Sequence, residues 1–154
     1  YFPAVMDSVA RNSTVLAEPD TLRGTERLLV VEDDEFVRHL LCETLRTHGY
    51  EVFSAPHPQK AIELSSLAEE PFDALVTDVI LPQMNGRELF LHLRIATPSL
   101  KVLYVSGYTR DVISRHGLLE KGILHLQKPF TIRGLLLAVR DAINAPSSEN
   151  EGDL

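Results

Sequence analysis

Short runs of apolar residues alternate along this sequence with segments that have the three- and four-residue apolar spacing of amphipathic helices. Uninterrupted apolar runs of this length are typical of strands buried on both faces of a parallel sheet. The predicted strands cover residues 27–31, 51–54, 73–77, 101–105 and 123–126. The predicted helices cover residues 35–47, 58–69, 86–95, 109–116 and 132–143. Five such alternations predict an α/β fold, doubly wound around a parallel sheet.

The two ends of the sequence lack this alternation. Residues 1–26 have no regular apolar period, and we interpret them as a linker. Residues 145–154 are polar and acidic, and we expect a disordered tail there. The 154 residues are enough for one hydrophobic core, so we expect one domain over residues 27–144. Because the first residue is not Met, we expect the chain to be a fragment.

Composition excludes several kinds of site. The single cysteine, Cys42, leaves no internal disulfide and no cysteine-based zinc site, and we expect it to be a small buried apolar residue. The six histidines lack the spacing of metal ligands. The net charge of −7 argues against nucleic acid as a direct partner. No apolar run reaches the length of a transmembrane helix, and we expect no signal peptide in the first ten residues, which lack a basic segment followed by an apolar block.

Polar residues follow most of the predicted strands at the point where each strand ends. The carboxyl ends of parallel strands meet at one edge of a sheet, so these side chains should converge. Clustered carboxylates repel one another, and a site that keeps them needs a cation. A lysine supplies part of the charge, and all-oxygen ligands favour Mg²⁺ or Mn²⁺ for the rest. The converging residues are Glu32, Asp33, Asp34, Asp78, Ser106 and Lys128.

The same residue types are suited to phosphoryl transfer. A carboxylate can attack phosphorus and form an aspartyl phosphate, and a metal and a lysine neutralise the phosphoryl oxygens. This chemistry makes Asp78 the candidate nucleophile, and Ser106 a candidate hydrogen-bond donor to the phosphoryl group.

Each residue alone also has a purely structural interpretation. The acidic run at residues 32–35 is typical of a helix N-terminus, and Asp34 can cap that helix while Asp33 binds metal. Asp78 and Ser106 are ordinary loop or turn residues when taken singly. Lys128-Pro129 is an ordinary loop pair, with a cis peptide bond as an option. The prediction of a site therefore depends on convergence.

Four segments also occur together in the order found in one family: VVEDD (30–34), TDVILPQMNG (77–86), YVSGYT (104–109) and LQKPF (126–130). Over about residues 27–144 the sequence resembles the receiver domain of bacterial response regulators. The resemblance implies a five-stranded (βα)5 flavodoxin-like receiver fold. It also implies a phosphoacceptor function in two-component or phosphorelay signalling.

The resemblance implies a role for each acid. Asp78 matches the phosphoacceptor and is also a metal ligand. Asp33 matches a direct Mg²⁺ ligand, while Glu32 acts more through water. The backbone carbonyl of Ile80 matches a third protein ligand.

Three further residues match the family's remaining functional positions. Ser106 matches the switch hydroxyl, and Lys128 matches the lysine that contacts the phosphoryl group. His125 occupies the aromatic switch position, where Phe or Tyr is usual. We therefore expect coupling from Ser106 to the distal face to differ from the common pattern.

The segment SGYT (106–109), followed by RDVISRHG (110–117) and LQKPF (126–130), resembles receivers fused to the C-terminus of hybrid sensor histidine kinases. Tyr1-Phe2-Pro3 is similar to the closing strand of a histidine-kinase ATP-binding domain. The implied partner is a phosphohistidine on a kinase dimerisation domain or a histidine phosphotransfer domain. We expect it to dock on the helix starting near Glu35, where Phe36, Val37 and Leu40 offer apolar surface. Some of these three residues must face the core, and the structural alternative is that all three do. The resemblance also implies a cytoplasmic location and no membrane contact by this chain. A weak homodimer is a further option.

Other functions remain open at this stage. We expect this chain to lack a kinase catalytic core, although the resemblance implies that a receiver promotes its own phosphorylation and dephosphorylation. A stand-alone response regulator and a receiver-like module that only binds protein are the main alternatives. A flavodoxin-like cofactor binder would need Ser, Thr and Gly after the first strand, where acids stand instead. An aspartate phosphatase would need an acid at position 80, which is Ile80.

Overall fold

The computed structural model describes residues 22–109 and 123–146. Its strands are β2 (Arg27–Val31), β3 (Glu51–Ala55), β4 (Ala74–Asp78), β5 (Lys101–Ser106) and β6 (His125–Gln127). Its helices are α3 (Glu35–Thr47), α4 (Pro58–Leu67), α5 (Gly86–Ala96) and α7 (Ile132–Asn144). The helix predicted over residues 109–116 and the predicted acidic tail lie almost entirely outside the described residues, as do residues 1–21.

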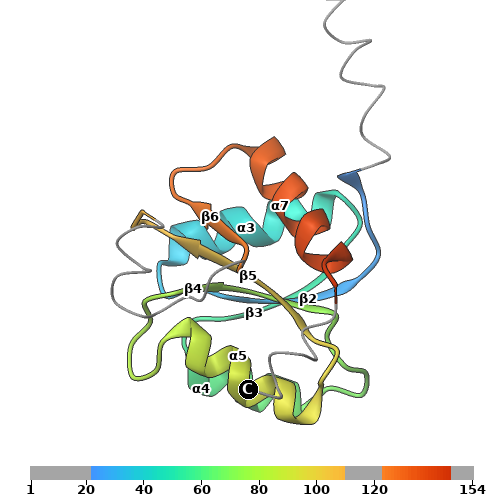
Figure 1. Ribbon diagram of the computed structural model, residues 1–154, viewed down its shortest axis with the longest axis vertical. Coiled ribbons are helices and arrows are strands. Elements are labelled where there is room, and N and C mark those ends of the chain that lie inside the picture. Colours follow the sequence, from blue (N-terminus) through green and yellow to red (C-terminus); the bar gives the residue numbers. More distant parts are fainter. Residues whose placement is uncertain (1–21, 110–122, 147–154) are drawn as a thin grey trace, which may run out of the picture.

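The five strands form one parallel sheet in the order β3-β2-β4-β5-β6. Figure 1 shows α3 and α7 on one face of this sheet and α4 and α5 on the other. The predicted doubly wound parallel sheet is therefore confirmed. The order reverses between β2 and β4, the place where open α/β sheets bind ligands beyond the strand ends.

An apolar core lies on each side of the sheet. Leu28 and Val30 of β2 face the core beneath α3 and α7, whereas Leu29 and Val31 face the core above α4 and α5. All four side chains are at most 1% exposed. Burial on both faces explains why the sequence of this strand is continuously apolar.

Local signals set the helix ends near the strand termini. Asp34 caps α3 by accepting the Val37 amide at 3.0 Å, as the acidic run suggested. Asn85 and Glu88 form a reciprocal capping box at the start of α5. Gly49 has a φ of 100°, which allows the chain to turn after α3 into β3. These caps fix where the loops above the sheet begin.

Two of the exclusions from composition can be compared with the fold. Cys42 is free and buried on α3, in agreement with the prediction of a small apolar residue. Among the described helices, none combines the length and the apolarity needed to cross a membrane.

Candidate functional site

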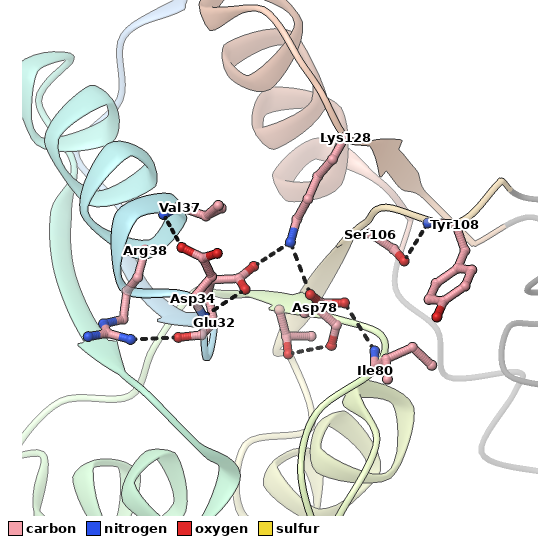
Figure 2. Close-up of polar contacts among 10 residues, drawn as sticks. Glu32, Asp34, Val37, Arg38, Asp78, Ile80, Ser106, Tyr108 and Lys128 are labelled. Atoms are coloured by element: carbon pink, nitrogen blue, oxygen red, sulfur yellow. Dashed lines mark hydrogen bonds and ion pairs between the residues drawn. The ribbon is translucent and has the colours of Figure 1, made fainter.

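The carboxyl ends of β2, β4 and β6, at one edge of the sheet, position the predicted site residues. Glu32 directly follows β2, and its amide donates to the Ala55 carbonyl at 3.2 Å. Asp78 is the last residue of β4 and pairs with Val105, so the sheet fixes its backbone. Lys128 follows β6, and its amide donates to the Ser106 carbonyl at 2.7 Å. Figure 2 shows the Glu32, Asp78 and Lys128 side chains pointing toward one another.

Lys128 bridges two buried carboxylates. Its Nζ donates to Glu32 Oε1 at 2.8 Å and to Asp78 Oδ2 at 3.0 Å. The second oxygen of Glu32 accepts the Asp34 amide at 3.1 Å, and the second oxygen of Asp78 accepts the Ile80 amide at 3.0 Å. Glu32 is 1% exposed and Asp78 is 9% exposed. Both carboxylates are therefore held in fixed orientations (Figure 2).

Burial and neighbouring charges shift the pKa values of both Glu32 and Lys128. Burial raises the pKa of Glu32 above its usual value, and the nearby Asp78 adds to this effect, against the bonds from Lys128 and Asp34. Burial also disfavours the charged Lys128 amine, but the bonds and charges of Glu32 and Asp78 outweigh it and raise the pKa of Lys128. The lysine is therefore a cation at neutral pH.

The charge balance of the cluster fits a divalent cation. Glu32, Asp33 and Asp78 each offer a carboxylate oxygen, and these oxygens lie within 4.8 Å of one another. Three carboxylates face one lysine, so two negative charges are left over when all are ionised. Asp33 is exposed, which leaves one side of the cluster open to solvent. A hard cation with oxygen ligands, such as Mg²⁺ or Mn²⁺, suits this donor set.

The remaining predicted residues surround this cluster. Ser106 is fully buried at the end of β5, and its Oγ accepts the Tyr108 amide at 3.1 Å. Ile80 is 44% exposed and Tyr108 is 52% exposed beside the site. His125 lies in β6 opposite Tyr104 of β5, three residues before Lys128. The structure thus brings Ser106 to the same sheet edge, while its hydroxyl bonds within its own loop.

Three supporting residues were not identified from the sequence. Arg38 of α3 donates from Nη1 to the Glu32 carbonyl at 2.8 Å, and Thr77 Oγ1 donates to the Asp78 carbonyl at 2.9 Å. Gly86 packs its Cα against the Asp78 carbonyl. Asn85-Gly86 is a recognisable turn signal, but no sequence pattern indicates that an arginine or threonine will reach a particular carbonyl.

Replacing Gly86 with alanine should damage the site through the backbone of Asp78. A Cβ there would collide with the Asp78 carbonyl oxygen and lie 3.1 Å from Thr77 Cγ2. We expect the free energy of unfolding in urea to fall by about 1–3 kcal/mol, the usual cost of overpacking. Gly107→Ala is the control, since a Cβ at Gly107 meets nothing within 4 Å. Equal stability of the two variants would contradict this.

Comparison with known proteins adds independent findings. The family model of the response regulator receiver domain matches residues 28–140. The sensor kinase CckA of Brucella abortus is 30% identical over 135 residues, which cover 88% of this chain and 14% of that kinase. The response regulator receiver protein CpdR of the same species is 32% identical over 111 residues, covering 72% of this chain and 91% of CpdR. This chain thus spans a small part of the kinase and nearly all of CpdR.

Solved structures agree with the sequence comparison. The receiver domain of the hybrid histidine kinase CckA superposes with a TM-score of 0.62 at 32% identity, covering 77% of this chain and 99% of that domain. The chemotaxis protein CheY4 of Vibrio cholerae superposes with a TM-score of 0.67 at 26% identity, covering 77% of this chain and 99% of CheY4. With the family model matching most of its length, this chain belongs to the response regulator receiver domain family.

Proposed function

We propose that this chain is a phosphoacceptor that takes a phosphoryl group from phosphohistidine onto Asp78, with Mg²⁺ as cofactor. The observation that carries the proposal is the convergence of Glu32, Asp33, Asp78 and Lys128 at one sheet edge. Two-component signalling through histidine kinases or phosphotransfer domains is the setting in which receiver domains act. A cytoplasmic location suits that setting and forms part of the proposal.

The chemistry follows from the positions of the side chains. An oxygen of the Asp78 carboxylate attacks phosphorus while the bond from phosphorus to the donor imidazole nitrogen breaks, and the imidazole keeps that electron pair. Lys128 stays charged and neutralises the phosphoryl oxygens. Ser106 then turns its hydroxyl toward one of these oxygens. Water later attacks phosphorus, which releases phosphate and restores the carboxylate.

The cation would be held by the carboxylates of Asp33 and Asp78, with Glu32 acting more through water and the Ile80 carbonyl as a further ligand. When bound, Mg²⁺ supplies positive charge opposite the phosphoryl oxygens. Glu32 and Asp78 need little rearrangement, because each already has its second oxygen fixed by a backbone amide. Ile80 and Tyr108 flank the open side and slow hydrolysis by excluding water.

Phosphotransfer with and without Mg²⁺ tests this proposal. The chain is incubated with acetyl phosphate and read by intact mass. We expect one added phosphoryl group with Mg²⁺ and none after chelation. A receiver-like module that only binds protein would gain no phosphoryl group under either condition, and that result would overturn the proposal.

We further propose that the chain is the C-terminal part of a hybrid sensor histidine kinase. The match to CckA, named a sensor kinase, supports this, as it extends over 88% of the chain. The match to nearly the full length of CpdR favours the alternative, a stand-alone receiver. The genomic sequence upstream of Tyr1 discriminates between them: a kinase ATP-binding domain supports the first, and a start codon shortly before Tyr1 supports the second.

The exposed start of α3 is the proposed docking surface for the phosphodonor. Phe36 is 76% exposed and Leu40 is 38% exposed, whereas Val37 packs against the core. The predicted apolar surface therefore comes from two of its three expected residues.

We expect Phe36→Ala to slow phosphotransfer from the cognate phosphohistidine domain by about tenfold, the loss of one well-buried interface side chain. Transfer from acetyl phosphate should be unchanged, since the Phe36 side chain is 76% exposed and contributes no polar atom to the carboxylate cluster. Ile95→Ala is the control, because Ile95 is 80% exposed on α5 across the sheet. Equal slowing with both donors would show that Phe36 acts on the site itself.

A further inference from the structure

The segment that precedes β2 packs on the domain and forms backbone hydrogen bonds with it. We call residues 22–26 the leading segment. Leu22 is 8% exposed and belongs to the core beneath α3 and α7. The Gly24 amide donates to the His48 carbonyl at 3.1 Å, and the Glu26 carbonyl accepts the Glu51 amide at 3.0 Å. Figure 1 shows this segment beside the C-terminal end of α7. The leading segment therefore packs with the domain before the first strand begins.

Arg140 of α7 connects the leading segment to Tyr50, the residue directly before β3. Its Nη1 donates to Glu26 Oε1 at 2.9 Å and to the Tyr50 hydroxyl at 3.1 Å. Tyr50 is 3% exposed, and the side chains of Arg140 and Glu26 are 21% and 25% exposed. We call these three residues the Arg140 clasp. One nitrogen serves two oxygens that packing holds in place, so a shift of about 1 Å breaks this geometry.

The charges favour a closed clasp near neutral pH. Burial opposes ionisation of Glu26, but the hydrogen bond and charge of Arg140, together with backbone hydrogen bonds at Thr25 and Glu26, outweigh it and lower the pKa of Glu26. A lowered carboxyl pKa stabilises the fold above the usual value of 4.5, and this stabilisation is lost as the pH falls through the lowered pKa. Burial raises the pKa of Tyr50, which keeps its hydroxyl neutral. The charge states that the clasp needs are therefore present at neutral pH.

Helix α7 links the clasp to the carboxylate cluster. It begins at Ile132, four residues after Lys128, with Thr131 as its cap. Its apolar face is packed tightly on the sheet, with Leu135 and Val139 at most 1% exposed. A helix held this way shifts as one body, so a displacement near Lys128 reaches Arg140.

We propose that the Arg140 clasp couples the phosphorylation state of Asp78 to the leading segment. Both hydrogen bonds of the clasp are formed in the structure described, in which Lys128 donates to both Glu32 and Asp78. A phosphoryl group on Asp78 draws Lys128 toward its oxygens and shifts the start of α7. The clasp therefore stabilises the unphosphorylated state and opens on phosphorylation. This inference rests on the proposed function, and it makes residues 22–26 the route by which a domain fused ahead of Leu22 senses Asp78.

Coupling between two sites is reciprocal, so opening the clasp should favour the phosphorylated state. Beryllium fluoride with Mg²⁺, a non-covalent mimic of the phosphoryl group, is titrated into the 154-residue chain. We expect Arg140→Gln and Glu26→Gln each to bind it about fivefold tighter than wild type or more. The double variant should gain little beyond either one, because both remove the same contact.

Arg46→Gln is the matched control. Arg46 ties the end of α3 to the Val52 carbonyl at 2.9 Å without reaching the leading segment. Its affinity for beryllium fluoride should stay within about twofold of wild type. Should Arg140→Gln fail to fold, Tyr50→Phe removes only the hydroxyl and should still tighten binding.

Hydrogen exchange provides a local readout. Binding of beryllium fluoride to wild type should speed exchange of the Gly24 and Glu51 amides, and Arg140→Gln should show fast exchange without it. Unchanged or weaker binding by the clasp variants, with wild type binding normally, would overturn the clasp and leave the proposed function intact. Absence of binding by wild type would overturn both.

Discussion

Asp78→Asn is expected to abolish phosphorylation by acetyl phosphate or phosphohistidine. The amide is a poor nucleophile toward phosphorus, and it also removes one carboxylate from the candidate metal site. Intact mass after incubation with Mg²⁺ should show only the unmodified chain, where wild type gains one phosphoryl group.

The loss should not come from unfolding. The substitution relieves repulsion between Asp78 and the buried Glu32, but the single amide oxygen can accept only one of the two hydrogen bonds that Asp78 accepts. The free energy of unfolding should therefore stay within about 1–2 kcal/mol of wild type. Asp73→Asn is the matched control just before the other end of β4, where Asp73 accepts the Arg27 amide at 2.8 Å. Asp73→Asn should be phosphorylated normally. Uptake of label by Asp78→Asn would remove Asp78 from its proposed role.

Lys128→Met is expected to impair both catalysis and stability. Removing the cation that faces the phosphoryl oxygens should slow phosphorylation by about 10²–10³-fold. Glu32 and Asp78 would also lose their shared partner while buried, which costs about 3–5 kcal/mol of the free energy of unfolding at pH 7. Added Mg²⁺ should restore part of this stability, because the proposed metal site is formed only by the folded carboxylate cluster.

The pH dependence gives the Lys128 experiment a second readout. Because the pKa of Lys128 is raised, the charged amine stabilises the folded state fully below the usual pKa of 10.5. This stabilisation is lost as the pH rises through the raised pKa. The stability difference between wild type and Lys128→Met should therefore narrow above pH 10.5. Lys60→Met is the control, since the Lys60–Glu63 pair is exposed at 3.7 Å and should contribute about 0.5 kcal/mol or less. Similar effects of both substitutions would argue against a special role for Lys128.

The sequence was sufficient to predict the fold because burial determines where apolar residues stand in each strand and helix. Strand β2 is apolar at every position from Leu28 to Val31, since both of its faces are covered. Boundaries were less predictable. Strand β4 continues through Asp78, because hydrogen bonding to β5 includes this polar residue. Helix α4 ends at Leu67, two residues before the predicted end, because Ala68 adopts an extended backbone.

The candidate site was predictable to the extent that topology alone decides it. Once the strands are parallel, residues that follow them share one edge, which places Glu32 near Asp78 and Lys128. Side-chain contacts that do not follow from the strand order were not predictable. Arg38 reaches back from the first turns of α3 to the Glu32 carbonyl, and Arg140 reaches Glu26 through packing between distant segments. Neither contact has a sequence period. The exposure of Phe36 beside the packed Val37 likewise depends on how α3 is rotated on the sheet.

The most direct test locates the phosphoryl group itself. An acyl phosphate is reduced by borohydride to an alcohol, which converts an aspartyl phosphate into homoserine at the modified position. The chain is phosphorylated by acetyl phosphate with Mg²⁺, reduced, digested and read by peptide mass. Homoserine at position 78 alone is the predicted result. Homoserine at Asp33 or another acid, or phosphorylation on a histidine with Asp78 unchanged, would contradict the account.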